Sequence, residues 1–161
     1  MTQEELIQAL KEIAFTEGFQ PGHIDKLADM AGEVHFAKNE LIFREGDASS
    51  LFYLLLAGKV ALDVTAAGRT IRIATLATGE ELGWSSLTPD HTKRFQARVL
   101  EPVRALAFDG ARLLHACEDD TAFGYAMARA LLKVVAQRLH ATRVQLLDVY
   151  TPVRSVKAAQ A

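Results

Sequence analysis

The most informative stretch for the architecture is residues 38–60, which read KNELIFREGDASSLFYLLLAGKV. It contains two short apolar runs, 41–43 and 51–56, separated by Glu45-Gly46-Asp47. Apolar runs of this length between turn residues predict consecutive β-strands joined by tight turns. Three residues at these turns are expected to adopt a positive φ: Asn39, Gly46 and Gly58.

The same pattern continues on both sides of this stretch, from Glu33 to Phe108. The apolar-rich runs are 34–36, 41–43, 51–56, 60–64, 71–73 and 103–107, with turn signals at Lys38-Asn39, Glu45-Gly46-Asp47, Ala57-Gly58, Ala67-Gly68 and Thr78-Gly79. This spacing is typical of a compact all-β sandwich or barrel. It predicts a barrel or jelly-roll-like β-roll over residues 33–108.

Helical periodicity flanks the predicted roll. Thr2 and Glu5 have the spacing of a capping box, which predicts a first helix to Ala14. A second helix is expected to begin at Pro21 and to stop at Gly32. Helix returns after Asp109 as 110–116 and then, after the cap candidates Asp119-Asp120, as a long helix ending near Thr151-Pro152. The expected organisation is a helical lead (1–32), the roll (33–108), C-terminal helices (109–150) and a tail (151–161).

The long helix carries a seam of side chains with alternating spacings of three and four residues. Its members are Tyr125, Ala128, Leu132, Val135, Leu139, Thr142, Leu146 and Val149. Such a seam over more than three heptads is typical of a coiled coil, so it predicts a homodimer interface. A second stripe, Met127, Leu131, Val134 and Ala141, is expected to pack on the roll.

Composition limits the classes of protein that this sequence can represent. Its 161 residues, 50% hydrophobic and 24% charged, predict one globular domain rather than a disordered chain. The longest apolar run, 51–57, is too short to span a bilayer, and the acidic N-terminus lacks a signal-peptide pattern. No membrane association is therefore expected, and a cytoplasmic location is predicted. The single cysteine, Cys117, cannot form an internal disulfide and is expected to be a small buried residue.

The net charge of −2 is unevenly distributed. Residues 121–161 contain six cationic side chains and one carboxylate, so the C-terminal segment is basic and the remainder acidic. A basic segment can contact nucleic acid or can be the solvated face of a helix. The five histidines have neither H-x-x-H nor H-E-x-x-H spacing, so no metal site is predicted.

The quoted stretch resembles the opening of cyclic-nucleotide-binding domains of the Crp/Fnr superfamily, which have a similar E-G-D, an aromatic-apolar strand and a G-K-V turn. The resemblance covers about residues 33–150. It implies an α+β fold, a double-stranded β-helix flanked by N-terminal helices and a long C-terminal dimerisation helix. Only 11 residues follow Tyr150, so a single-domain form without the winged helix-turn-helix is expected, with no sequence-specific DNA binding.

The resemblance also implies a phosphate-binding cassette within residues 79–98. Gly83 matches the family's cassette glycine. The implied ligand-binding residues are Leu82, Gly83, Trp84, Ser85, Ser86, Lys93, Arg94, Phe95, Gln96 and, from the long helix, Thr142. Thr142 falls where cyclic-AMP-responsive members present a threonine to the base, or it is simply a polar residue in the coiled-coil seam.

Two departures from the family pattern bear on the ligand. Trp84 stands where family members use a glutamate for the ribose hydroxyl, and Lys93 or Arg94 must replace the family arginine. Two lost charge-assisted hydrogen bonds correspond to about 3–6 kcal/mol, or roughly 10²–10⁴ in affinity. Cyclic AMP is therefore predicted to bind weakly or not at all. Trp84 has three interpretations: it plugs the pocket, stacks on a planar ligand, or covers the junction between the roll and the long helix.

Three functions remain open at this point. The preferred one is a non-enzymatic regulatory sensor that binds a small anionic, nucleotide-like ligand, such as a cyclic nucleotide, and signals through the long helix. The alternatives are a degenerate domain acting as a dimeric scaffold for an unidentified protein partner, and a DNA-associated transcriptional regulator using the basic tail. Residues 83–87 lack the second glycine of a hydrolase nucleophile elbow, so no catalytic residue is predicted. The segment 79–98 and the ending 145–150 also resemble small bacterial proteins of this superfamily with a G-W-S motif.

Overall fold

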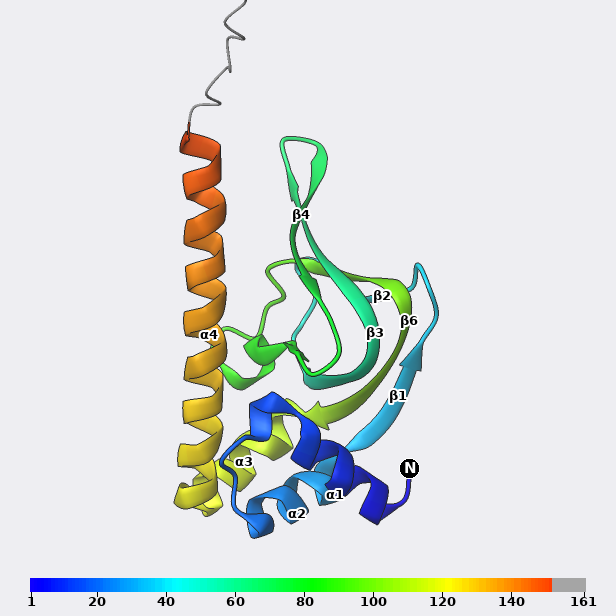
Figure 1. Ribbon diagram of the computed structural model, residues 1–161, viewed down its shortest axis with the longest axis vertical. Helices are drawn as coiled ribbons and strands as arrows, with labels where there is room; N and C mark the ends of the chain where they lie inside the picture. Colours follow the sequence, from blue (N-terminus) through cyan, green and yellow to red (C-terminus); the bar gives the residue numbers. More distant parts are fainter. Residues whose placement is uncertain (152–161) are drawn as a thin grey trace, which may run out of the picture.

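The computed structural model describes residues 1–151. A six-stranded antiparallel sheet curls into a roll, three short helices gather at one end of it, and the long helix α4 runs beside it (Figure 1). The predicted α+β class, with a β-roll and a long C-terminal helix, is confirmed. Two cationic residues of the predicted basic tail, Arg154 and Lys157, lie outside the described residues.

The N-terminal helices begin where their caps predict. Helix α1 (Gln3–Glu12) has a complete capping box, in which Glu5 N donates to Thr2 Oγ1 at 3.2 Å. It ends two residues earlier than expected, and the 3₁₀ helix η1 (Ala14–Thr16) follows. Helix α2 (Pro21–Met30) begins at the expected proline. The helix stops before Gly32 as expected, with Ala31 as its C-cap, and Gly32 begins β1 and pairs with Ala107.

The sheet is antiparallel throughout and is built on two long strands. The strands are β1 (Gly32–Phe36), β2 (Leu41–Phe43), β3 (Leu51–Ala66), β4 (Arg69–Leu76), β5 (Glu81–Leu82) and β6 (Gln96–Asp109). Their order is β1-β6-β3-β4, with β2 also paired to β6 and β5 to β3. Because β3 and β6 pair along most of their length, they carry the other strands around the roll.

The turn predicted at Ala57-Gly58 is wrong: the chain remains in β3 there. The β3–β6 register shifts on both sides of Ala57, so this is a bend within one strand. Gly58 has a φ of 94°, and a Cβ on it would lie 2.3 Å from the Pro102 carbonyl oxygen. Position 58 therefore requires glycine, because its φ is positive and because a side chain would collide with the Pro102 backbone. The positive φ values predicted for Asn39 and Gly46 are confirmed at 70° and 87°.

Two apolar clusters stabilise the fold. One fills the roll and includes Leu55, Val60, Leu62, Val99 and Ala105. The other joins the helices to the outside of the roll and includes Leu10, Leu27, Phe52, Phe108 and Phe123. Since β3 and β6 contribute to both clusters, alternate residues of the same strands hold the roll and attach the helices.

The C-terminal helices are α3 (Gly110–Asp119) and α4 (Thr121–Tyr150). Asp109 caps α3 by accepting from Arg112 N at 2.8 Å, and Asp120 caps α4 by accepting from Phe123 N at 3.1 Å. In the stripe predicted to pack on the roll, Met127 and Val134 are buried and Leu131 is half-buried, whereas Ala141 is exposed. Cys117 is half-buried rather than fully buried.

The predicted seam of α4 faces outward in the single chain. Tyr125 and Leu132 are 64% and 68% exposed, and Val135, Leu139, Leu146 and Val149 are exposed as well. Within residues 1–151, no helix combines the length and apolar character needed to cross a membrane.

Candidate functional site

The segment 79–98 leaves the sheet after β4 and returns to it as β6. Its first part turns at Gly79, pairs with β3 through β5, and reaches Gly83. Gly83 has a φ of 81° and precedes the 3₁₀ helix η2 (Trp84–Leu87). The helix expected after Gly83 is therefore a single short turn, packed between β3 and α3.

Gly83 and Lys93 meet in the interior although ten residues separate them. A Cβ on Gly83 would lie 2.5 Å from the Leu51 carbonyl oxygen and 3.0 Å from Lys93 Nζ. No larger residue fits there without displacing the β3 backbone. The close approach of the lysine thus depends on the missing side chain at position 83.

Lys93 is a buried cation. The residue is 5% exposed, and its ammonium lies 4.3 Å from the Phe43 ring centroid and 3.5 Å from the Leu51 carbonyl oxygen. No carboxylate of the described chain lies within 4.0 Å of it. Burial lowers the pKa of Lys93 to about 8, opposed by the negative charge of Asp47. This is the most strongly perturbed basic group in the segment.

Arg94 points away from this interior. Its guanidinium is exposed and pairs with Asp90, whose pKa that hydrogen bond lowers. The two adjacent cations therefore lie in different environments, Lys93 in the interior and Arg94 at the surface. The sequence left Lys93 and Arg94 as equal alternatives, and the structure places Lys93 beside Gly83.

Two serines of η2 occupy different environments. Ser85 Oγ lies 2.7 Å from Ser49 Oγ, so that pair forms a hydrogen bond. Ser86 Oγ is shielded from solvent and has no hydrogen-bond partner among the described residues. Ser86 packs directly on Gly110, where a Cβ would lie 2.8 Å from the serine Cβ.

The remaining predicted residues of the segment pack in the roll or pair in β6. Leu82 is buried in the roll cluster, and Phe95 packs against the same cluster. Gln96 begins β6 opposite Asp63, a buried residue whose carboxylate accepts from Arg98 Nη2 at 3.1 Å. Neither Phe95 nor Gln96 has a hydrogen bond to Gly83 or Lys93 within residues 1–151.

Trp84 is half-buried against the cluster that joins the helices to the roll. This position corresponds to the third interpretation of the tryptophan, a side chain that covers the junction between the roll and the helical layer. Trp84 is also the single tryptophan of the chain, so its fluorescence reports on this segment.

Thr142 does not reach the segment. It is exposed, and its hydroxyl donates to the Arg138 carbonyl oxygen one turn earlier, at 2.9 Å. This local hydrogen bond satisfies the hydroxyl within α4. That Thr142 faces a ligand stays a prediction.

Arg138, which the sequence analysis missed, connects α4 to the segment. Its Nη2 donates to Glu81 Oε1 at 2.6 Å and also to the Glu81 carbonyl oxygen. The Glu81 side chain is 9% exposed; its burial raises its pKa, while the charge of Arg138 works in the opposite direction. The signal available in the sequence was a lone cation between Val134 and Ala141 on the roll-facing stripe.

A cavity of about 470 Å³ lies beside this ion pair, between β4, the turn at 79–81 and α4. Its polar lining comes from both sides, with Glu80 and Glu81 from the roll and Lys133, Gln137, Arg138 and Gln145 from the helix. Across residues 1–151, no group of three or more histidine, cysteine, aspartate or glutamate residues is arranged to hold a metal ion.

Comparisons with known proteins identify similar chains. Residues 33–120 match the family described as "Cyclic nucleotide-binding domain". The CRP-like cAMP-activated global transcriptional regulator of Mycobacterium tuberculosis is 25% identical over 155 residues, which cover 95% of this chain and 67% of that protein.

Solved structures have the same fold. One, from Geobacter metallireducens and assigned to the cyclic nucleotide-binding proteins, is 26% identical with a TM-score of 0.73, covering 87% of this chain and 99% of that one. A cyclic nucleotide-binding domain from Methylobacillus flagellatus has a TM-score of 0.79 at 16% identity, covering 91% of this chain and 83% of that one.

Proposed function

Because the chain belongs to the cyclic nucleotide-binding domain family, we propose that it is a non-enzymatic sensor that binds a small anionic, nucleotide-like ligand beside Gly83. The observation that carries this proposal is the buried ammonium of Lys93. A buried cation without a carboxylate partner is costly, and an anion bound there would supply the missing charge. A charge-assisted hydrogen bond to it would contribute about 1.5–3 kcal/mol.

Access to Lys93 requires movement of the segment that precedes β6. Residues 91–93 are held to the 46–49 loop by three backbone hydrogen bonds: Gly46 N to Lys93 O, Lys93 N to Asp47 O and Ser49 N to His91 O. Only one isolated β-bridge, Ala48 to Thr92, joins the two loops as sheet. Such a small hydrogen-bonded unit can open without disturbing the clusters on either side of the sheet.

The chemistry at position 84 argues against cyclic AMP as a tight ligand. An indole cannot replace a carboxylate as acceptor for a ribose hydroxyl, since its one polar group is an N–H donor. The proposed ligand class is therefore defined by its anionic group, which Lys93 would hold. The base and sugar would be recognised by contacts other than those made by a glutamate.

The proposed output passes through α4. Arg138 donates a hydrogen bond to Glu81, which is two residues from Gly83. A ligand that displaces the segment 79–98 would therefore also displace α4. The exposed seam of α4 would pair with a second copy of the chain. Regulation would then consist of a change in the position of α4 within a homodimer.

Fluorescence of Trp84 tests the proposal. Titration of the protein with a panel of cyclic mono- and dinucleotides should give a saturable change with at least one of them and little or none with cyclic AMP. Lys93→Met should weaken the binding ten- to a hundredfold, because it removes the ammonium but keeps an apolar chain. Arg94→Ala, the matched control at the neighbouring position, should change the affinity less than threefold.

Three results would contradict the proposal. A flat response to every nucleotide would favour the scaffold alternative, in which the domain binds no small molecule. Binding that survives Lys93→Met but not Arg94→Ala would place the anion outside the roll. Discrimination between DNA duplexes at physiological salt would favour the DNA-associated regulator.

A further inference from the structure

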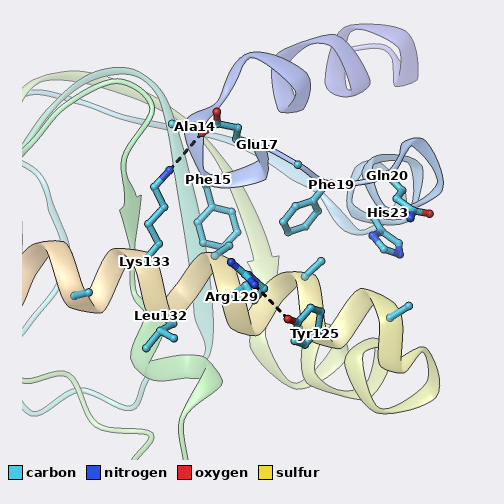
Figure 2. Close-up of a pocket in the computed structure, with 15 residues that line it drawn as sticks. Ala14, Phe15, Glu17, Phe19, Gln20, His23, Tyr125, Arg129, Leu132 and Lys133 are labelled. Atoms are coloured by element: carbon cyan, nitrogen blue, oxygen red, sulfur yellow. Dashed lines mark hydrogen bonds and ion pairs between the residues drawn. The ribbon is translucent and has the colours of Figure 1, made fainter.

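A second, larger depression lies on the other side of Lys133, remote from Gly83 and Lys93. It is a groove of about 1000 Å³ between the η1–α2 connection and the first half of α4. Figure 2 shows Phe15, Phe19 and His23 together on one side of α4, Arg129 and Tyr125 on the helix, and Leu132 pointing away from the two phenylalanines. None of the residues from β5 to the start of β6 lines it.

The walls of the groove are apolar and ring-rich. Phe15 and Phe19 are tilted neighbours with centroids 6.3 Å apart, and His23 meets Phe19 edge-on at 6.2 Å. On the α4 side the groove is lined by alanines, including Ala126 and Ala130. Because these side chains are short, the helix leaves a space that neighbouring side chains do not fill. A planar or aliphatic group would be well matched to such walls.

The two cations that line the groove, Lys133 and Arg129, differ in their partners. Lys133 already pairs with Glu17 across the groove, at 3.3 Å. Arg129 has no carboxylate within 4.0 Å among residues 1–151: its guanidinium donates to the Tyr125 hydroxyl at 3.3 Å and lies 5.8 Å from that ring centroid. The tyrosine positions the guanidinium at the edge of the apolar walls while leaving its other N–H groups free for an acceptor.

On the opposite wall, His23 has a ring nitrogen without a hydrogen-bond partner among the described residues. Its Nδ1 is shielded from solvent and has no hydrogen-bond partner in the described part of the chain. A buried polar atom without a partner is unfavourable. A hydrogen-bonding group of a bound molecule would remove that cost.

We propose that this groove binds a small amphipathic carboxylate, with its apolar body against Phe15 and Phe19 and its carboxylate on Arg129. Its ligand class differs from the nucleotide-like ligand of the first site, because the aromatic and alanine walls match an apolar body and Arg129 is left to hold one carboxylate. Its face of α4 lies about a quarter turn from the centre of the seam, given 100° per residue. In a dimer paired through the seam, the ligand would lie beside the partner helix and could report to it.

Calorimetric titration of the full chain with 2-naphthoate, and with the uncharged 2-naphthamide of the same shape, tests this assignment. The acid should bind at least tenfold more tightly than the amide. Arg129→Gln, a substitution at an exposed position, should lower the affinity for 2-naphthoate to that for 2-naphthamide. The affinity for 2-naphthamide should not change. Arg143→Gln, an exposed arginine of the same helix outside the groove, should leave both unchanged.

A second variant tests the apolar walls. Ala126→Leu should fill the groove and abolish binding of both compounds, and its thermal unfolding should remain cooperative. The proposal is overturned if neither compound binds, if the two bind equally, or if Arg129→Gln leaves 2-naphthoate unaffected. It is also overturned if Ala126→Leu converts a dimer to a monomer in sedimentation, because the groove would then accommodate a second copy of the chain.

Discussion

Lys93 and Arg94 illustrate what can be inferred at the scale of single residues. They are adjacent, equally cationic and equally compatible with the family pattern, yet one is 5% exposed and the other lies on the surface with Asp90. Both residues precede β6, and Lys93 is held there by backbone hydrogen bonds with Gly46 and Asp47. The resemblance to the family implied a cation at this point, but which of the two residues is buried depends on the tertiary contacts of the folded chain.

The depressed pKa of Lys93 predicts a specific dependence of stability on pH. Below pH 8 the lysine is charged in both the folded and the unfolded state, and the folded state carries the cost of burying the ammonium. Between about pH 8 and its usual value of 10.5, the unfolded state binds the proton and the folded state does not. The free energy of unfolding should therefore rise with pH across this window.

Urea unfolding of wild type and Lys93→Met at pH 7, 8 and 9.5 measures this effect. Lys93→Met should remove the rise and should be more stable than wild type at pH 7, by about 1–3 kcal/mol. Lys59→Met, which removes an exposed lysine, should keep the wild-type slope. Parallel pH profiles for wild type and Lys93→Met would mean that the ammonium is not buried in solution.

At the scale of elements, periodicity located the helices and strands but not how β3 bends or what ties α4 to the roll. The Ala57-Gly58 pair looks like a turn in sequence, and only the contact between Gly58 and Pro102 reveals a bend in a continuous strand. The position of Arg138 on the roll-facing stripe of α4 can likewise be predicted from the sequence. Its partner Glu81 cannot, because it is 57 residues away. Such long-range pairings depend on the assembled fold.

The contact between Arg138 and Glu81 predicts a measurable coupling. Arg138→Met leaves the buried Glu81 carboxylate without its partner, so it should lower the free energy of unfolding by about 1–3 kcal/mol. A double-mutant cycle with Glu81→Gln should give a coupling energy of similar size. The exposed pair Lys59 and Glu101, whose atoms are 2.7 Å apart, is the control and should couple by less than about 1 kcal/mol. Equal coupling in the two cycles would show that α4 is not held through this pair.

At the scale of the whole molecule, the roll, the flanking helices and the long helix were predictable because each has a long and regular apolar pattern. The described chain nevertheless leaves one of these patterns unpaired, the seam of α4. A contiguous apolar stripe on a soluble protein is typical of an interface. We therefore predict that the seam pairs with a second copy of the chain.

Leu139→Asp tests the seam. A charge at its centre should convert a dimer to a monomer in sedimentation velocity, because a buried unpaired carboxylate opposes the pairing of two helices. His140→Asp places the same charge at the next, exposed position outside the seam and should leave the dimer intact. A dimer that withstands Leu139→Asp would locate the interface on another surface.

The last part of α4 runs beside the β3–β4 hairpin (Figure 1). Arg138 is half-buried, residues 139–150 are exposed, and Gln145 touches β4 by one hydrogen bond to the Ile73 carbonyl oxygen. Twelve residues of helix beyond Arg138 span about 18 Å. A tilt of roughly 10° about Arg138 would then carry Tyr150 through about 3 Å of arc along such a helix. A tilt of α4 at its contact with Glu81 that is too small to disturb the roll would therefore move the C-terminal end of the helix by several ångströms. Such a movement would change which residues the seam can contact on a second copy of the chain.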